Sequence, residues 1–516
     1  MTHSKSYFAL VSPLTRLLDK PREDFTRRDL IRVLEEQQIE RIGFHYTALD
    51  GKLKELKIPV SNARQAEVIL AEGERVDGSS LFKGMVDAAV SDLYVVPIYR
   101  SAFLNPFVPR SLDFVCRYFT KDGQMAPFAP DTILAKASAL LQRTTGYSLH
   151  TLGELEFFLI GDNQTQIFPA RRQQGYHAAA PFVKGGQFLD EMVQTITQIC
   201  GHVKYAHSEV GSIEGIRSDL PELKGKCGEQ LEIEFLPRPV EESADSLVLG
   251  RWLIRNIAYR HQCVATFAPK LEEGIAGNGL HIHMALMKDE KNVMTDGHGE
   301  LTAEARKIIG GLCHCADSLT AFGNTVSSAY LRLVPDQEAP TRICWSNLNR
   351  STMIRVPLGW SKVNTQLARL INPQEKEEFV REESRQTIEL RSPDGSAMAH
   401  LLLAGVTMAA QWGLTRPESS ALAEKYYVTG NIFKEKRLLD SLPALPGSCV
   451  ASSRLLLEKR ALYERDDIFP PSVIDYTARM LLQENDETMN LRLVDLPADD
   501  RLHETRKIMH RCLHEQ

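Results

Sequence analysis

Short apolar runs that alternate with polar residues dominate the first hundred residues of the chain. Alternation over about four to eight residues is typical of a half-buried β-strand. Residues 39–49 and 50–60 follow this pattern, and Asp50-Gly51 between them is a β-hairpin signal. A stretch rich in Gly, Pro and polar residues follows at 119–132. The pattern therefore predicts a small α+β domain over residues 1–125, with a domain boundary at its end.

Beyond this boundary the apolar spacing changes to that of amphipathic helices. Apolar residues recur every three or four positions in 129–146, 187–203 and 243–262, and short strand-like runs separate these segments. Asp131 stands near the start of the first segment and is expected to be its N-cap. The pattern predicts a larger mixed domain over residues 126–516 that ends in a helical tail.

Composition narrows the class of protein. The chain has 516 residues, 43% hydrophobic and 25% charged, which suits a globular protein of more than one domain. Its formal net charge is −6 and no basic run stands out, so we expect no nucleic-acid partner. There is no apolar run of about 18 residues and no leader-like start, so we expect a cytoplasmic protein without a membrane partner. The nine cysteines form no CxxC pair and are expected to be reduced thiols.

Charged side chains inside apolar strands are the most informative feature. Residues two apart project from the same side of a strand. Four strand-like runs carry such pairs: Glu154 and Glu156, Glu232 and Glu234, His281 and His283, Glu389 and Arg391. In one strand alone, a solvated polar face would be the ordinary interpretation. Burying these groups unpaired would cost several kcal/mol each, so four strands together indicate a site for Mg²⁺ or Mn²⁺.

Arginines supply a second set of candidate residues. Arg332, Arg350, Arg355 and Arg391 lie in sequence motifs that follow one another along the chain. The planar fork of a guanidinium suits phosphate and carboxylate groups. The chain has no GxxxxGK[ST] loop and no kinase signature set, so ATP would be bound by a different fold.

Six motifs, in order, resemble those of the glutamine synthetase family of ATP-dependent carboxylate–amine ligases. They lie at 77–97 (DGSSLFKG to SDLYVVP), 153–159 (GELEFFL), 277–286 (GNGLHIHMAL), 330–340 (YLRLVPDQEAP), 349–357 (NRSTMIRVP) and 388–405 (IELRSPDGSAMAHLLLAG). The resemblance implies an N-terminal β-grasp-like domain and a catalytic domain with a curved antiparallel sheet and helices. It also implies a homo-oligomer with active sites between subunits, as in dodecamers of two stacked hexameric rings.

The resemblance assigns two metals and the residues that hold them. One metal, which holds the substrate carboxylate, would be bound by Glu156, Glu209 and Glu232. The second, which bridges the ATP phosphates, would be bound by Glu154, His281 and Glu389. Glu232 and Glu234 share a strand face, so spacing alone leaves both open, and the pattern Gln230-Leu231-Glu232 favours Glu232.

The remaining roles follow from the same resemblance. Glutamate would be held by Gly277, Arg332 and Arg391, and the ATP phosphates by His283, Arg350 and Arg355. The ammonium pocket would consist of Asp77, Ser80, Tyr176, Glu209 and Glu338. Within this set, Asp77 would be the base that deprotonates ammonium, Glu338 the gate, and Arg350 a catalytic residue for phosphate transfer.

The chain departs from the family pattern at several positions. Residues 211–230 form an insertion between two metal-ligand motifs, Ala276 replaces an asparagine, and the tail after residue 420 is divergent. The leading interpretation is a ligase that forms γ-glutamyl phosphate from L-glutamate and ATP and aminates it with ammonia to give glutamine. The alternatives are a γ-glutamyl ligase for an organic mono- or polyamine and a non-catalytic structural or regulatory family member.

Overall fold

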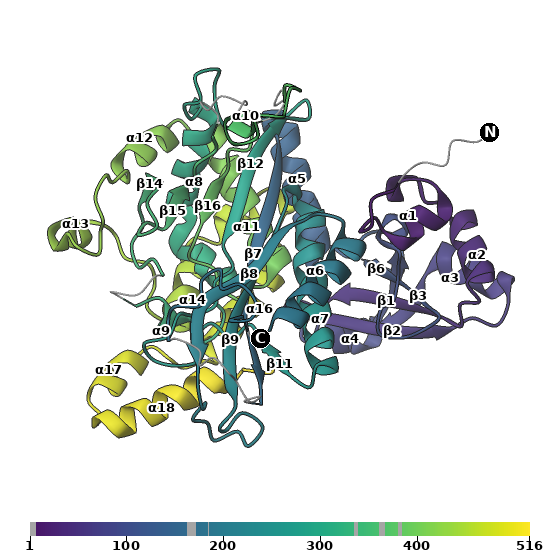
Figure 1. The fold of residues 1–516 in the computed structure, drawn as a ribbon, viewed down its shortest axis with the longest axis horizontal. Coiled ribbons are helices and arrows are strands. Elements are labelled where there is room, and N and C mark those ends of the chain that lie inside the picture. Colours follow the sequence, from purple (N-terminus) through teal and green to yellow (C-terminus); the bar gives the residue numbers. More distant parts are fainter. Residues whose placement is uncertain are drawn as a thin grey trace.

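The computed structural model describes residues 7–162, 172–183, 185–334, 339–360, 367–379 and 384–515. A small N-terminal sheet and a large C-terminal sheet organise the chain, and Figure 1 shows them side by side, with the small sheet to the right. The connection between them runs from residue 120 to 129, and the boundary proposed at residue 125 falls inside it.

The N-terminal sheet has the strand order β2-β1-β6-β4-β3, with β5 paired to β6. Its first two strands form the predicted hairpin, in which Thr47 pairs with Leu53, whereas β1 and β6 run parallel. The strands are β1 (Arg41–Thr47), β2 (Leu53–Pro59), β3 (Glu74–Asp77), β4 (Asp92–Pro97), β5 (Phe103–Leu104) and β6 (Ser111–Phe119). The helices are α1 (Pro13–Leu18), α2 (Arg27–Glu36), α3 (Ala63–Glu72) and α4 (Gly78–Leu81).

The C-terminal sheet has the strand order β14-β15-β16-β12-β7-β9-β8. All its described neighbours pair antiparallel except β14 and β15, as expected for a curved antiparallel sheet. The strands of this path are β7 (Ser148–Gly161), β8 (Val203–Ile213), β9 (Cys227–Phe235), β12 (Ile282–Lys288), β14 (Trp345–Asn347), β15 (Ile354–Val356) and β16 (Ile388–Leu390). Short strands beside it are β10 (Arg238–Pro239), β11 (Val264–Thr266) and β13 (Lys291–Asn292).

Long helices cover this sheet, because their apolar positions recur at helical spacing and are buried. They are α5 (Pro130–Thr145), α6 (Gly186–Cys200), α7 (Val240–Arg260), α8 (Ala303–Gly323) and α11 (Ala399–Thr415). Two short helices, α9 (Ala329–Arg332) and α10 (Leu367–Ile371), lie between the later strands. The most apolar of the long helices, α11, packs against α5, α7 and α8.

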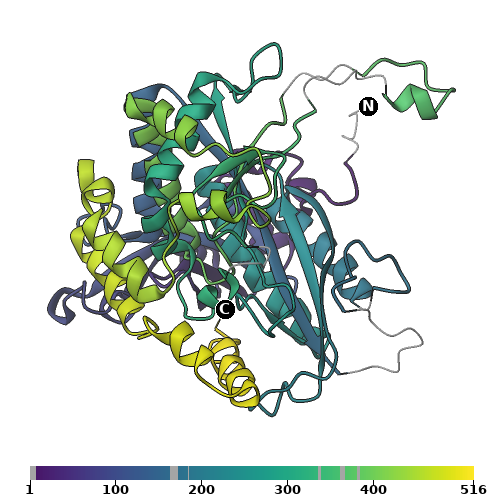
Figure 2. The ribbon, with the colours of Figure 1, turned by 90° about the vertical axis from the view of Figure 1, so that its left-hand side faces the viewer.

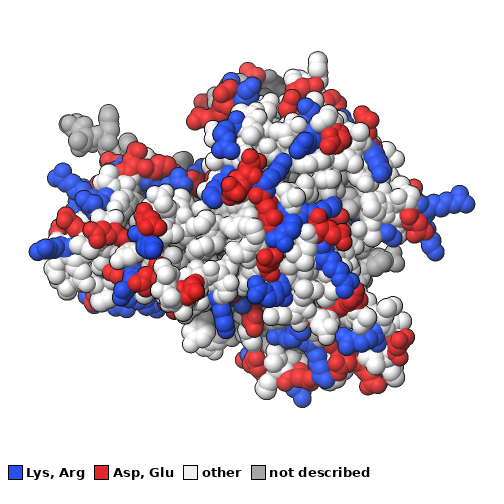
Figure 3. Space-filling view, turned by 180° about the vertical axis from the view of Figure 1, so that it is seen from behind, with Lys and Arg blue, Asp and Glu red and all other residues white. Residues whose placement is uncertain are grey.

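The tail after residue 416 is helical, as predicted, and Figure 2 shows it running along one side of the molecule. Its helices are α12 (Glu418–Lys425), α13 (Lys436–Ser441), α14 (Cys449–Glu458), α15 (Ala461–Glu464), α16 (Pro471–Leu482), α17 (Met489–Val494) and α18 (Ala498–His510). Among the described residues, no helix combines the length and apolar character needed to cross a bilayer. On the face in Figure 3, acidic and basic side chains are interspersed rather than gathered by sign.

A buried ion-pair cluster joins the N-terminal sheet to helices α5 and α7. Arg117 on β6 makes a two-pronged contact with Asp245 on α7, at 3.1 and 2.6 Å, and lies 3.4 Å from Asp131. The prediction that Asp131 caps helix α5 was wrong. The N-cap is Ala129 and Pro130 begins the helix, so Asp131 falls in the first turn and faces the Arg117 guanidinium instead.

Candidate active site

Neighbouring strands bring the predicted carboxylates and histidines together. In the antiparallel pairing of β7 with β9, Glu154 stands opposite Glu234 and Glu156 opposite Glu232. On the other side of β7, the backbone N–H of Glu154 donates to the carbonyl of His281, at 3.0 Å. Strand β16 adds Glu389 opposite His283 of β12. Because side chains alternate along each strand, one face of the sheet is lined with charged groups.

The first cluster is centred on Glu154. One carboxylate oxygen of Glu154 lies 2.7 Å from His281 Nδ1 and the other lies 2.9 Å from His283 Nε2. Glu389 Oε1 is 3.7 Å from His281 Nδ1. Burial alone would raise the pKa of Glu154, but His283 and His281 outweigh it and hold that pKa well below its usual range. Burial would also raise the pKa of Glu389, but the nearby His283, His281 and Arg391 outweigh burial, so this pKa is lowered.

The second cluster combines Glu209 and Glu232 with His207, which the sequence interpretation missed. His207 Nε2 is 3.5 Å from Glu232 Oε2, and its Nδ1 is 3.9 Å from Glu209 Oε1. Glu156 lies in the same cavity, where its Oε2 accepts from the backbone N–H of Gly279 at 2.9 Å. Burial and the charges of Glu154, Glu156 and Glu209 raise the pKa of Glu232 well above its usual range. The carboxylates of this cluster therefore repel one another.

Divalent metal ions fit these clusters. The candidate ligand atoms of Glu154, Glu156 and His281 lie within 4.8 Å of one another, as do those of His207, Glu209 and Glu232. Mg²⁺ and Mn²⁺ bind carboxylate oxygens as ligands, and an imidazole nitrogen can complete such a set. A cation would also relieve the repulsion that raises the Glu232 pKa. Glu234, the open alternative to Glu232, instead accepts from Lys204 Nζ at 2.7 Å and does not line the cavity.

The predicted arginines surround the carboxylates. Arg355 Nη1 donates to Glu389 Oε2 at 2.9 Å, and Arg391 Nε donates to Glu389 Oε1 at 3.0 Å. Arg391 also donates to the carbonyl of Arg350. Partial burial would lower the pKa of the solvent-accessible Arg350, but the neighbouring Tyr176 hydroxyl and Glu389 raise it. All four guanidinium groups, including the buried Arg332, therefore belong to one site.

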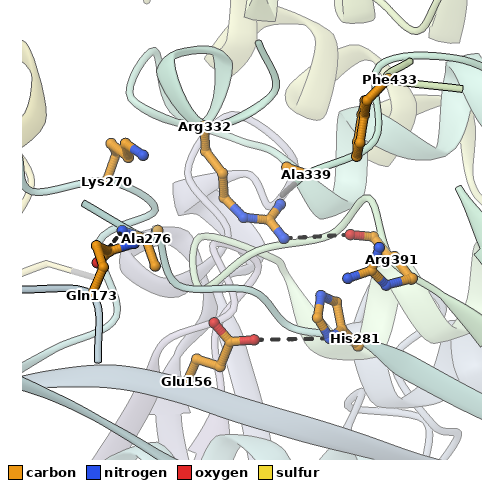
Figure 4. A pocket seen from close by; sticks show the side chains of 10 residues that line it. Glu156, Gln173, Lys270, Ala276, His281, Arg332, Ala339, Arg391 and Phe433 are labelled. Carbon is orange, nitrogen blue, oxygen red and sulfur yellow. Dashed lines mark hydrogen bonds and ion pairs between the residues drawn. The ribbon is translucent and has the colours of Figure 1, made fainter. Parts of the chain in front are cut away.

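Two adjoining cavities open over these residues. The smaller has a volume of about 100 Å³. It is lined by Glu154, Glu156, Tyr176, Tyr205, His207, Glu209, Gln230, Glu232, Ala276, His281, Arg350, Arg355, Glu389 and Arg391. The larger, of about 380 Å³, is drawn in Figure 4. Its lining residues are Glu156, Gln173, Lys270, Ala276, Gly277, His281, Arg332, Ala339, Arg391 and Phe433. In Figure 4 the Arg332 side chain extends from above toward the space over Glu156, and Arg391 lies to its right, close to His281.

Gly277 lies on a loop, residues 269–278, that we call the substrate loop. The carbonyl of Gly277 accepts a hydrogen bond from Gln230 Nε2 at 3.0 Å. The N–H of the preceding Ala276 donates to Gln173 Oε1 at 3.1 Å. The Asn278 side chain, fully buried, donates to the carbonyls of Thr266 and Ala268 and holds the loop closed. Gln173 and Gln230 are thus further site residues that the sequence interpretation missed, because neither lies in a charged strand pair.

The predicted ammonium-pocket residues fall in different places. Tyr176 lines the smaller cavity beside Glu209, and its segment runs along β8, with the His177 N–H donating to Ser208 O at 2.9 Å. Asp77 and Ser80 lie on β3 and α4 of the N-terminal domain and line neither cavity of this chain. Glu338 lies outside the described residues.

Asp77 and Ser80 nevertheless form a local unit. Ser80 Oγ donates to Asp77 Oδ2 at 2.6 Å, and the Ser79 N–H donates to Oδ1 at 2.9 Å. Hydrogen bonds from Ser79 and Ser80 lower the pKa of Asp77 to about 2, so its carboxylate is ionised at neutral pH.

Family models match both parts of the chain. The model described as the glutamine synthetase catalytic domain matches residues 128–492, and the glutamine synthetase beta-Grasp domain matches residues 38–121. A β-grasp domain joined to a catalytic domain of this kind defines the class of protein. The chain belongs to the glutamine synthetase family.

Individual relatives agree with this assignment. The glutamine synthetase of Halobacterium salinarum is 29% identical over 430 residues, which cover 81% of this chain and 85% of the relative. That of Thermus thermophilus is 28% identical over 403 residues, covering 76% and 81%. Among solved structures, Plasmodium falciparum glutamine synthetase has a TM-score of 0.70 at 18% identity, covering 92% of this chain and 98% of its own. A complex of a protein called GmaS with ADP has a TM-score of 0.67 at 18% identity, with the same coverage. The predicted α+β fold is thereby confirmed.

Proposed function

We propose that the protein is an ATP-dependent ligase that converts the γ-carboxylate of L-glutamate to an acyl phosphate and aminates it with ammonia to give glutamine. One observation carries the proposal: carboxylates, histidines and four arginines converge on two adjoining cavities. A carboxylate is a poor acyl donor, and phosphorylation by ATP supplies the leaving group. Positive groups around the transferring phosphoryl group stabilise the charge on its oxygens.

The larger cavity is the proposed glutamate site. Arg332 and Arg391 would hold the two carboxylates of the substrate, and the backbone of Gly277 would contact its amino-acid end. Arg332 Nη1 donates a hydrogen bond to the carbonyl of Ser392 at 3.0 Å, and this contact holds the Arg332 side chain in place beside the cavity. Arg350, Arg355 and His283 would contact the phosphates of ATP.

Two Mg²⁺ or Mn²⁺ ions complete the proposal. When bound, they would neutralise phosphate charge and polarise the substrate carboxylate. Glu156, Glu209 and Glu232 would hold one ion, and Glu154, His281 and Glu389 the other. His207 contacts the first of these groups and orients Glu232.

The smaller cavity is the proposed ammonium site. The Glu209 carboxylate and the Tyr176 ring line this cavity side by side, and such groups suit a small cationic acceptor. Tyr176 and Glu209 would bind the cation from this chain, Glu338 would act as the gate, and Asp77 with Ser80 would come from a neighbouring subunit. The proposal therefore includes a homo-oligomer with shared active sites, of the stacked-ring kind, in the cytoplasm.

Mixing inactive variants tests the shared site. Asp77→Asn and Glu154→Gln proteins are each expected to be inactive alone. After dissociation and reassembly together, the mixture should regain part of the activity, since some sites receive both intact halves. Mixed oligomers without any activity would refute the shared site.

An organic amine is the second candidate acceptor, and the rim of the smaller cavity favours it. The rings of Tyr176 and His177 stack at 4.2 Å, His177 and His207 also lie 4.2 Å apart, and Tyr205 is 5.7 Å from His207. The Tyr176 side chain is 48% exposed, so these rings face an incoming ligand. Aromatic faces attract organic ammonium ions through cation–π interactions.

The acceptor panel separates the candidates. Phosphate release from ATP is measured with Mg²⁺ and L-glutamate, with ammonium or one of a series of mono- and polyamines, each with and without glutamate. Turnover with ammonium that depends on glutamate supports the proposal, whereas turnover only with an organic amine supports the second candidate. No turnover with any acceptor would refute both and leave the non-catalytic alternative.

A further inference from the structure

The C-terminal helix α18 packs against the outer side of the substrate loop. Arg506 of α18 makes a two-pronged ion pair with Glu272, with both N···O distances 2.8 Å. One turn earlier, Arg501 Nη2 lies 3.3 Å from Glu273 Oε1. The Arg506–Glu272 pair is more than four-fifths buried on both sides, so solvent screens it less than an ordinary surface pair.

The end of α18 adds hydrogen bonds to the same segment. His510 Nε2 lies 2.9 Å from the carbonyl of Leu271, which can only accept, so this nitrogen carries the proton. Its Nδ1 is 2.9 Å from Ser218 Oγ, which then donates to it. Beyond the helix, the carbonyl of Leu513 accepts from Thr266 Oγ1 at 2.7 Å. His510 therefore links the tail, the insertion and the substrate loop.

A small apolar cluster lies under these polar contacts. It is separate from the main core and combines the insertion, the substrate loop and the tail: Phe158, Ile160, Ile213, Ile216, Leu223, Ala268, Leu271, Ile275 and Leu513. The insertion at 211–230 and the tail after residue 420 are the two long segments in which the chain departs from the family pattern. They meet on the outer side of the loop whose inner side lines the substrate cavity.

Side chains do not pack closely around the whole of this ion pair. A third cavity, of about 440 Å³, lies beside it between the insertion, the substrate loop and α18. Its lining includes Arg217, Glu272, Leu502 and Arg506. Since the surface next to the loop is hollow there, loss of the Arg506 charge leaves few other contacts to hold Glu272.

We propose that Arg506 and His510 are positioning residues: from outside, they hold the substrate loop in the conformation that binds the acid substrate. Contacts that fix the loop at Glu272 also limit the movement of Ala276 and Gly277, which lie four to five residues later and line the larger cavity. This inference rests on the proposed use of that cavity for glutamate. Arg350 and Arg355, which would contact the phosphates, lie outside this loop, so the larger effect is expected on binding of the acid substrate.

Steady-state kinetics of Arg506→Met tests the proposal. We expect the KM for glutamate to rise about fivefold, as a partly buried ion pair predicts, with the KM for ATP unchanged. Arg454→Met is the matched control, because Arg454 forms an exposed pair with Glu487 away from the loop. The double variant Arg506→Glu/Glu272→Arg should restore the wild-type KM. An unchanged glutamate KM, or equal rises in the KM for both substrates, would overturn the proposal.

Hydrogen exchange separates this inference from the proposed function. Backbone amides of residues 271–278 should exchange faster in Arg506→Met and in His510→Phe than in the wild type and Arg454→Met, with equal melting temperatures. This readout needs no turnover, so it holds even if the wild type fails to use glutamate and the proposed function falls. Unchanged exchange in this segment would overturn the positioning role whatever the substrate is.

Discussion

Replacing Gly277 by alanine tests how closely the substrate loop must approach Arg332. A Cβ atom at position 277 would lie 2.4 Å from the carbonyl oxygen of Pro269 and 3.2 Å from the Arg332 side chain. Real Cβ atoms essentially never approach closer than 3.0 Å, so the loop must move by about 0.6 Å (3.0 − 2.4). The atom in the way is the backbone carbonyl oxygen of Pro269, which cannot move aside by a change of side-chain rotamer.

The loss of activity follows from this displacement. Misplacing a binding group by about 1 Å costs on the order of 100-fold, so a shift of about 0.6 Å should lower kcat/KM for glutamate about 10- to 100-fold. This corresponds to about 1.4–2.7 kcal/mol of transition-state stabilisation. ATP affinity should change less than glutamate affinity, because Arg350 and Arg355, which would contact the ATP phosphates, lie outside this loop.

Gly297→Ala is the matched control. A Cβ atom there meets nothing within 4 Å, and Gly297 is not among the glycines with positive φ. Both variants are compared with the wild type by phosphate release over a range of glutamate concentrations, and by ADP binding. If Gly277→Ala keeps the wild-type kcat/KM for glutamate, the assignment of the loop to the acid substrate is wrong.

Three further predictions address other parts of the structure. Glu389→Gln, which removes the anionic partner of Arg355 and Arg391, should lower kcat/KM about 100-fold and weaken Mn²⁺ binding in calorimetry; unchanged Mn²⁺ affinity would argue against its role as a ligand. Asp245→Asn should lower the free energy of unfolding by about 3 kcal/mol, because it leaves the buried Arg117 poorly paired; a melting temperature equal to that of the wild type would contradict this. Burial and the neighbouring arginines lower the pKa of His202 from 6.5 to about 4, so the unfolded chain takes up a proton on this side chain at a higher pH than the folded protein. Stability is therefore lost as pH falls from about 6.5 to 4, by about 3 kcal/mol for this group, and urea unfolding at both pH values should show a smaller loss in His202→Gln.

The clustered strands could be predicted because their chemistry is local. Glu154 and Glu156 are two residues apart in an apolar run, so the sequence alone indicates that both face the same side. Which strands lie next to each other is a matter of tertiary structure, and there the family resemblance supplied the expectation. The choice between Glu232 and Glu234 depends on Lys204 of β8, which takes the Glu234 carboxylate away from the cavity.

Other features of the site depend on tertiary contacts, which no local sequence pattern indicates. Gln173 and Gln230 hold the substrate loop through single hydrogen bonds, and glutamines of this kind are common on any surface. The ion pair between Arg506 and Glu272 joins residues 234 positions apart. From sequence alone, α18 reads as an ordinary polar amphipathic helix, and only the folded structure brings it against the loop.

Transfer of oxygen from glutamate to phosphate tests the central claim most directly. L-Glutamate labelled with ¹⁸O in its γ-carboxylate is turned over with ATP, Mg²⁺ and ammonium, and the released phosphate is analysed by mass spectrometry. If a carboxylate oxygen attacks the γ-phosphorus and ammonia then breaks the acyl C–O bond, each phosphate carries one ¹⁸O and one glutamine is formed per phosphate. Phosphate without ¹⁸O, or released without an amide product, would contradict the account.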